Sequence, residues 1–114
     1  MGKIFGHRGL PRIYRENSIT GLNKAFEYCD YVETDVRITA DNNLILFHDP
    51  DINGQFINEL STEEILNKLN DVEKDELILS SRDQIDGKVN FEIKTNSLEK
   101  TQIDILFQKM LSIL

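Results

Sequence analysis

The chain has 114 residues, of which 39% are hydrophobic and 29% are charged, and its formal net charge is -7. This balance is typical of one globular domain covering residues 1–114, and it excludes a disordered chain or a membrane-spanning segment. A negative chain is also a poor general partner for nucleic acid or an anionic membrane surface. The single cysteine, Cys29, cannot form an intrachain disulfide, and no secretory signal pattern is present. We therefore expect a cytoplasmic protein.

The first stretch predicts a strand, a loop and a helix. An apolar run at Ile4-Phe5 ends at Gly6-His7-Arg8-Gly9, where two glycines allow a tight loop. Asn17 or Ser18 can cap the helix that follows. The apolar positions of this helix repeat at helical spacing: Ile19, Leu22, Ala25, Phe26 and Cys29.

Two strands around a polar turn come next. Asp30-Tyr31-Val32 leads into the first strand, which carries Glu33 and Asp35. Asp41-Asn42-Asn43 supplies the turn, and Leu44 to Phe47 is a second strand that delivers His48 at its end. Glu33 and Asp35 are two residues apart, so both carboxylates project from one face of the strand. The polar stretch 49–59 predicts a loop, or a small hairpin around Gly54.

The second half predicts two helices and at least one strand. Ser61 and Glu64 match a capping box, which marks a helix start. Leu77-Ile78-Leu79 is either a short strand or an apolar anchor. After the Asp86-Gly87 turn, alternation predicts a strand over 88–94, with Glu92 and Lys94 on one face. A helix with one apolar stripe runs from Ser97 to the end of the chain.

This order of strands and helices predicts an α/β fold, with a parallel sheet flanked by helices. The carboxyl ends of parallel strands meet at one edge, where such folds place their chemistry. Seven polar side chains are expected to meet there: His7, Arg8, Glu33, Asp35, His48, Glu92 and Lys94.

The residue types indicate metal-assisted phosphoester hydrolysis. Three carboxylates suit a hard divalent cation, either Mg²⁺ or Ca²⁺. The two histidines can exchange protons near neutral pH, and Arg8 and Lys94 offer positive charge to a phosphate.

Each part also has a purely structural interpretation. Glu33 and Asp35 could lie on a solvated sheet face, Glu92 and Lys94 could form only a mutual ion pair, and Glu16-Asn17 could be a helix cap. Buried parallel strands are usually apolar throughout, so these polar groups together favour a site.

The same residues resemble the motifs of the glycerophosphodiester phosphodiesterase family, a (β/α)₈ barrel family related to the phosphatidylinositol-specific phospholipases C. The resemblance covers residues 3 to about 95. Its motifs are His7-Arg8-Gly9, Glu16-Asn17-Ser18, Glu33-Thr34-Asp35-Val36, Thr39 with Asp41, His48-Asp49 and Phe91-Glu92-Ile93-Lys94.

The resemblance implies a role for each residue. Glu33, Asp35 and Glu92 would bind the divalent metal, His7 and His48 would be the acid/base pair, and Arg8 and Lys94 would contact the phosphate. Glu16 and Asn17 would support the pocket. The implied reaction cleaves a glycerophosphodiester to sn-glycerol 3-phosphate and an alcohol.

The chain is short for this fold, because a closed eight-fold barrel typically needs more than 200 residues. We therefore expect a TIM-barrel type architecture of which about half is present. Three alternatives follow: a truncated copy of a longer enzyme, a half that pairs as a homodimer or with a missing C-terminal half, or a compact domain that binds metal and phosphoester without turnover. The metal, the alcohol and the division of acid and base between the histidines stay open.

Overall fold

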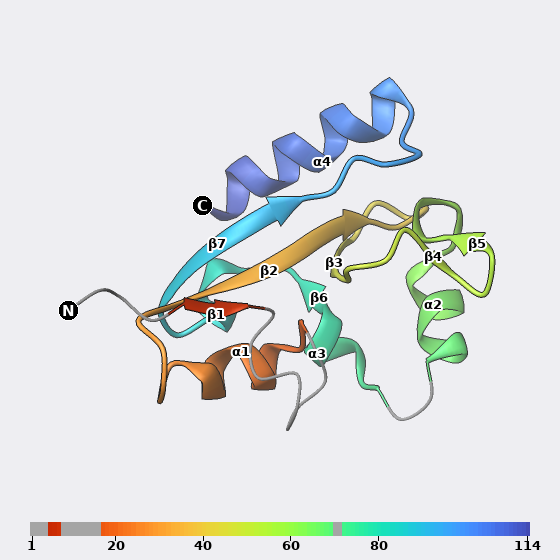
Figure 1. Ribbon diagram of the computed structural model, residues 1–114. Coiled ribbons are helices and arrows are strands. Elements are labelled where there is room, and N and C mark those ends of the chain that lie inside the picture. Colours follow the sequence, from red (N-terminus) through yellow and green to blue (C-terminus); the bar gives the residue numbers. More distant parts are fainter. Residues whose placement is uncertain (1–4, 8–16, 70–71) are drawn as a thin grey trace.

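The computed structural model describes residues 5–7, by their backbone only, together with 17–69 and 72–114. Its centre is a five-stranded sheet in which β2 (Tyr31–Ile38) is the longest strand. β1 (Phe5–His7) and β7 (Lys88–Ile93) both pair with β2 in parallel. The parallel sheet expected from the sequence is thus present in these three strands (Figure 1).

Only β3 runs the opposite way, so the sheet is mixed rather than parallel throughout. β3 (Leu44–Leu46) pairs antiparallel with β2, and β6 (Ile78–Leu79) pairs antiparallel with β3. The reason is the short connection over residues 39–43, because parallel neighbours need a crossover of a dozen residues or more. Asn42 takes a positive φ of 64° in this turn, as expected for asparagine.

Four α-helices connect and cover the strands. They are α1 (Ile19–Ala25), α2 (Thr62–Lys68), α3 (Lys74–Leu77) and α4 (Lys100–Ile113), with short 3₁₀ turns at Ile57–Glu59 and Arg82–Gln84. The loop after His48 contains the small hairpin, formed by β4 (Asp51–Ile52) and β5 (Gln55–Phe56). Leu77 ends α3 and the next two residues form β6, so the segment that the sequence left undecided is a helix end followed by a strand.

Helix boundaries differ from the expected ones at two places. α1 ends at Ala25, and Cys29 lies beyond it, only partly buried, rather than in the core as a helical residue. α4 begins at Lys100 instead of Ser97, because Ser97 has a φ of 65° that is incompatible with a right-handed helix. The capping box at the start of α2 is confirmed: Ser61 and Glu64 each accept a backbone N–H from the other.

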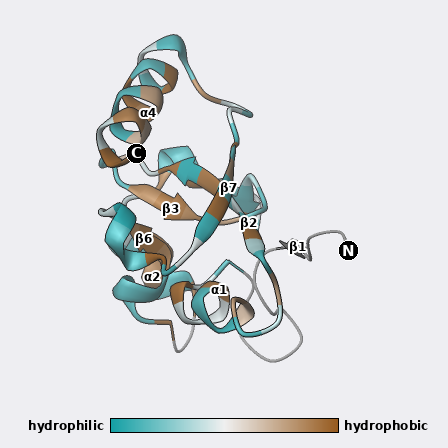
Figure 2. Ribbon diagram, turned by 90° about the vertical axis from the view of Figure 1, so that its left-hand side faces the viewer, coloured by the Kyte–Doolittle hydropathy of each residue, from teal (hydrophilic) through white to brown (hydrophobic). Residues whose placement is uncertain are grey.

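Two apolar clusters hold these elements together, one on each side of β3. The first joins α1 and α4 to one face of the sheet and includes Leu22, Val36, Leu46 and Leu106. The second surrounds Ile45 and joins the hairpin, α2 and α3. Leu44 and Leu46 belong to the first cluster and Ile45 to the second, as the alternation of a strand requires. Figure 2 shows the mixture of hydrophobic and hydrophilic turns along α4.

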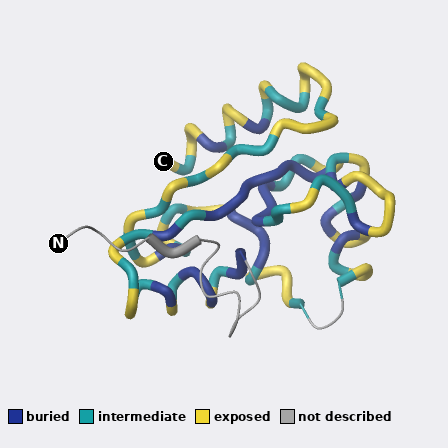
Figure 3. Tube along the Cα trace, viewed as in Figure 1, coloured by how far each residue is buried: buried dark blue, intermediate teal, exposed yellow. Residues whose placement is uncertain are grey.

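The sheet face opposite α1 and α4 is polar and partly open. Along β7, Lys88, Asn90 and Glu92 are exposed, whereas the residues between them are half-buried against the first cluster. β2 is buried over most of its length (Figure 3). None of the helices in the described part of the chain has the length and apolar character needed to cross a bilayer.

Candidate active site

Three carboxylates converge on the open face of the sheet. Glu33 and Asp35 lie on β2, and β7 pairs in register with Asp35 opposite Glu92. Glu33, Asp35 and Glu92 each offer an oxygen within 4.8 Å of the others. The parallel pairing of β2 and β7 therefore brings together the three acidic residues predicted from the sequence.

The side-chain ammonium of Lys94 lies at the edge of this cluster. Its backbone N–H donates to the carbonyl of Val36, which continues the β2–β7 pairing beyond the strand end. The ammonium Nζ lies 2.6 Å from Oε1 of Glu92 and 3.8 Å from Oδ1 of Asp35. The hydrogen bond from Lys94 lowers the pKa of Glu92 below its ordinary value. The mutual ion pair considered from the sequence thus exists, and it also reaches Asp35.

Asn17 is a hydrogen-bond partner of the buried carboxylate of Asp35. Its side-chain Nδ2 donates to Oδ2 of Asp35 at 3.0 Å. Its Oδ1 accepts from the hydroxyl of Thr34 at 2.9 Å and from the backbone N–H of Asp35 at 3.3 Å. Ser18, the other candidate, caps α1 by accepting from the N–H of Gly21. Asn17 is therefore not the helix cap, and its amide faces the carboxylate cluster instead.

His48 reaches the middle of β2, because β3 runs back along it. The backbone N–H of Phe47 donates to the carbonyl of Asp35, so the residue before His48 pairs with β2 at Asp35. His48 therefore follows an antiparallel strand rather than ending a parallel one. Nδ1 of His48 lies 2.8 Å from Oδ1 of Asp49. A carboxylate only accepts, so Nδ1 of His48 is the donor in this contact.

Arg37 is a residue of this site that the motif analysis missed. It follows Glu33 and Asp35 on the same face of β2 and is only 6% exposed. Its Nε and Nη2 donate to the carbonyl of His48 at 3.1 and 2.6 Å. Burial lowers the pKa of the guanidinium, against the opposing effect of Asp35 and Asp49. The same two-residue spacing that identified Glu33 and Asp35 could have identified it.

The described part of the chain omits the side chains of three predicted residues: His7, Arg8 and Glu16. The backbone of His7 pairs with Glu33 across β1 and β2, so its strand lies next to the cluster. Arg8 and Glu16 lie outside the described residues.

The donor set fits a hard divalent cation. Three carboxylate oxygens are the ligands that Mg²⁺ and Ca²⁺ prefer, with remaining positions open to water or substrate. Among the described residues, the three carboxylates outnumber the neighbouring cations Lys94 and Arg37, so a further cation is electrostatically favoured.

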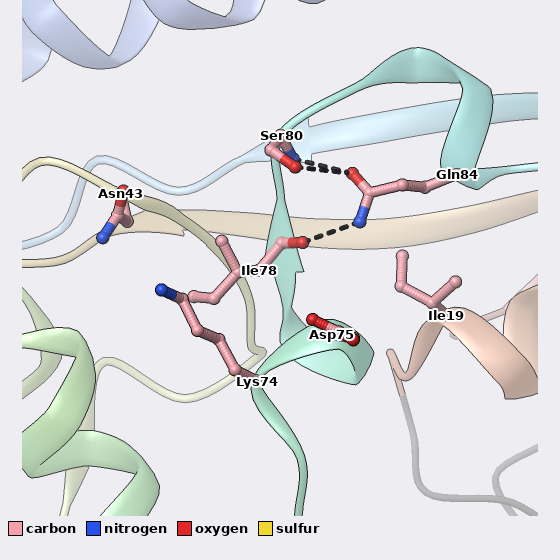
Figure 4. A pocket seen from close by; sticks show the side chains of 7 residues that line it. All are labelled: Ile19, Asn43, Lys74, Asp75, Ile78, Ser80 and Gln84. Carbon is pink, nitrogen blue, oxygen red and sulfur yellow. Dashed lines mark hydrogen bonds between the residues drawn. The ribbon is translucent and has the colours of Figure 1, made fainter.

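A hollow of about 500 Å³ lies elsewhere, between α1, α3 and β6. Figure 4 shows that Gln84 crosses it, bonding to Ser80 and to the carbonyl of Ile78. It contains none of the carboxylates above. The candidate site does not include this hollow, where Gln84 is already bonded to Ser80 and Ile78.

Comparison with known proteins agrees with this geometry. The sequence model of the glycerophosphoryl diester phosphodiesterase family matches residues 7–107, so the chain belongs to this family. A glycerophosphodiester phosphodiesterase of Caldanaerobacter subterraneus is 34% identical over 68 residues, which are 54% of this chain and 28% of that protein.

Solved structures show the same relationship in three dimensions. The glycerophosphodiester phosphodiesterase of Thermotoga maritima superposes with a TM-score of 0.67 and 26% identity, covering 95% of this chain and 49% of that one. An Oleispira antarctica phosphodiesterase, solved with sn-glycerol-3-phosphate, gives a TM-score of 0.72 over 100% of this chain and 52% of that one, and its 18% identity shows the fold alone. The chain thus spans about half the length of these structures. The expected fold class, a partial TIM-type barrel, is confirmed.

Proposed function

We propose that this site hydrolyses glycerophosphodiesters to sn-glycerol 3-phosphate and an alcohol. The observation that carries the proposal is the convergence of Glu33, Asp35 and Glu92 within 4.8 Å, in a chain of this family. Lys94 contacts two of these carboxylates and so supplies positive charge where a phosphate would bind, and His48 is proposed to supply proton transfer there.

Glu33, Asp35 and Glu92 would hold Mg²⁺ or Ca²⁺. When bound, such an ion polarises a phosphoryl oxygen and neutralises developing negative charge. The side-chain amide of Asn17 holds Asp35 in one orientation. The ammonium of Lys94, which donates to Glu92, would donate to a phosphate oxygen when substrate is bound. Arg8 is proposed to contact the phosphate and Glu16 to support the pocket, on the resemblance of their motifs.

His7 and His48 are proposed to move the protons. One imidazole accepts the proton of the attacking oxygen as the new P–O bond forms, and the other gives a proton to the oxygen of the departing alcohol as the old P–O bond breaks. The contact of Nδ1 with Asp49 orients the ring of His48, and Nε2 is the nitrogen proposed to exchange the proton. A cytoplasmic location stays a prediction.

The test is release of sn-glycerol 3-phosphate from glycerophosphocholine with Mg²⁺ or Ca²⁺ added to the folded chain. Glu33→Ala, Asp35→Ala, His7→Ala and His48→Ala are each expected to lower turnover by at least about 100-fold. Glu63→Gln is a matched control, because Glu63 is an exposed acidic residue on α2. A well-folded sample that releases no glycerol 3-phosphate at saturating metal would exclude hydrolysis by this chain.

A second candidate function is a half-barrel that binds metal and phosphoester but needs a partner half to turn over. The exposed inner face of β7 favours it, because barrel interiors are normally closed by the next strands. Size-exclusion chromatography with light scattering distinguishes the forms. A folded monomer that binds metal without turnover supports the binding role, and a folded dimer with turnover supports assembly from halves.

A further inference from the structure

We infer that Arg37 is a positioning residue, which fixes His48 against the carboxylate cluster by clasping its backbone. The inference rests on the proposed function of His48 as a proton-transfer group. It adds a part of the site that none of the recognised motifs includes.

The geometry is that of a two-point clasp. Nε and Nη2 of Arg37 both bond to one oxygen, the carbonyl of His48. Because Nε and Nη2 belong to one rigid planar group, two bonds fix direction as well as distance. The contact joins β2 to the second residue after β3, beyond the ladder pairs of Leu44, Ile45 and Leu46 and the bond from Phe47 to Asp35. Arg37 therefore holds His48 where strand pairing no longer does.

The placement of Arg37 also keeps it out of direct phosphate binding. Its guanidinium is buried, and its charge is compensated by Asp35 and Asp49. Lys94, by contrast, is 20% exposed in its side chain and sits beside Glu92 at the open face. The two cations thus have different roles. Lys94 is accessible to a ligand, and Arg37 binds the backbone carbonyl of His48.

The chain offers a matched control in Arg82. Its Nη1 and Nη2 likewise donate to backbone carbonyls, those of Ile85 and Gly87. This clasp closes the turn before β7 and involves no residue of the carboxylate cluster. Replacing either arginine removes the same type of contact, but only Arg37 acts on His48.

The first measurement needs no turnover. The protein has two histidines, His7 and His48, so an imidazole ¹⁵N–¹H spectrum of the full chain contains two ring systems, which a His7→Gln sample assigns. Arg37→Gln is expected to shift or broaden the His48 ring signals and leave those of His7 in place. Arg82→Gln is expected to leave both unchanged.

The second measurement is kinetic. Loss of alignment of about 1 Å lowers rates by up to about 100-fold, so Arg37→Gln should lower kcat by about 10- to 100-fold while KM changes less than about threefold. Arg37→Lys keeps the positive charge but has one donor nitrogen. It should therefore shift the His48 ring signals as Arg37→Gln does, and should lower log kcat by at least half as much as Arg37→Gln. Arg82→Gln should keep kcat.

The outcomes separate the inference from the proposed function. If the parent chain has no turnover but Arg37→Gln moves the His48 signals, the proposed hydrolysis fails and the positioning role stands. A folded Arg37→Gln with unchanged His48 signals overturns the positioning role, and so does full kcat in Arg37→Lys, which would assign the effect to charge alone. Should Arg37→Gln fail to fold, Arg37→Lys decides by the same ring signals.

Discussion

Asn17 is the residue whose replacement tests the architecture of the site most directly. It is 1% exposed and makes two hydrogen bonds to the equally buried Asp35 and a third to the hydroxyl of Thr34. Its φ of 59° lies in the left-handed region, which asparagine and glycine tolerate and alanine does not. Asn17→Gly and Asn17→Ala therefore remove the same hydrogen bonds and differ in backbone strain.

The expected cost follows from these contacts. A hydrogen bond to a charged group contributes about 1.5–3 kcal/mol, and the Thr34 hydroxyl also loses its acceptor, so Asn17→Gly should lower the free energy of unfolding by about 2–4 kcal/mol. Asn17→Ala should cost about 1 kcal/mol more, because of its positive φ. Affinity for Mg²⁺ should fall in both, since Asp35 loses its orienting partner.

Urea denaturation followed by circular dichroism gives the free energies, and isothermal titration gives the metal affinity. Asn17→Asp keeps the shape of the side chain and sets a second carboxylate against Asp35, so it should be less stable than the parent. If Asn17→Gly costs less than about 0.5 kcal/mol, or if Ala and Gly are equally stable, the contacts of Asn17 do not support the site as described.

Two further predictions concern the support of the fold. Burial raises the pKa of Asp41, but hydrogen bonds from Thr39 and Thr62 outweigh it and hold the pKa below its ordinary value. The stability that Asp41 contributes is therefore complete above about pH 3.9 and is lost as the pH falls toward its folded pKa. Asp41→Asn should make the free energy of unfolding, measured by urea denaturation, depend less on pH between roughly pH 2 and 5, where carboxyls titrate. An unchanged pH dependence would contradict the assignment. A Cβ at Gly87 would lie 2.6 Å from Cε1 of Phe26, so Gly87→Ala should cost about 1–3 kcal/mol by overpacking. Phe26→Leu in the same chain should recover part of that loss, and a fully stable Gly87→Ala would show that the ring can move aside.

Much of the site could be predicted from the sequence, because it depends on local rules. Two-residue spacing puts Glu33 and Asp35 on one face, and alternation in β7 does the same for Glu92 and Lys94. That β2 and β7 are parallel neighbours in register is the long-range fact that joins the pairs, and the order of elements indicated it.

The rest depends on contacts that no local pattern encodes. The direction of β3 was predictable in principle from the five-residue turn, but the alternating order of elements favoured a parallel sheet. Asn17 fits a helix cap equally well on local grounds, and only the approach of α1 to β2 shows its amide bonded to Asp35. Two-residue spacing places Arg37 on the face of Glu33 and Asp35, but its contact with the carbonyl of His48 arises only because β3 folds back along β2.

The second apolar cluster, around Ile45, gives the segment between β2 and β7 a core of its own. Its members come from the chain between Ile45 and Ile78, so these contacts are closer in sequence than the pairing of β2 with β7. Short loops close at lower entropic cost, and such a segment can order early and open as a separate cooperative unit. Variation within the hairpin and α2 is then largely insulated from the strands that carry the carboxylates.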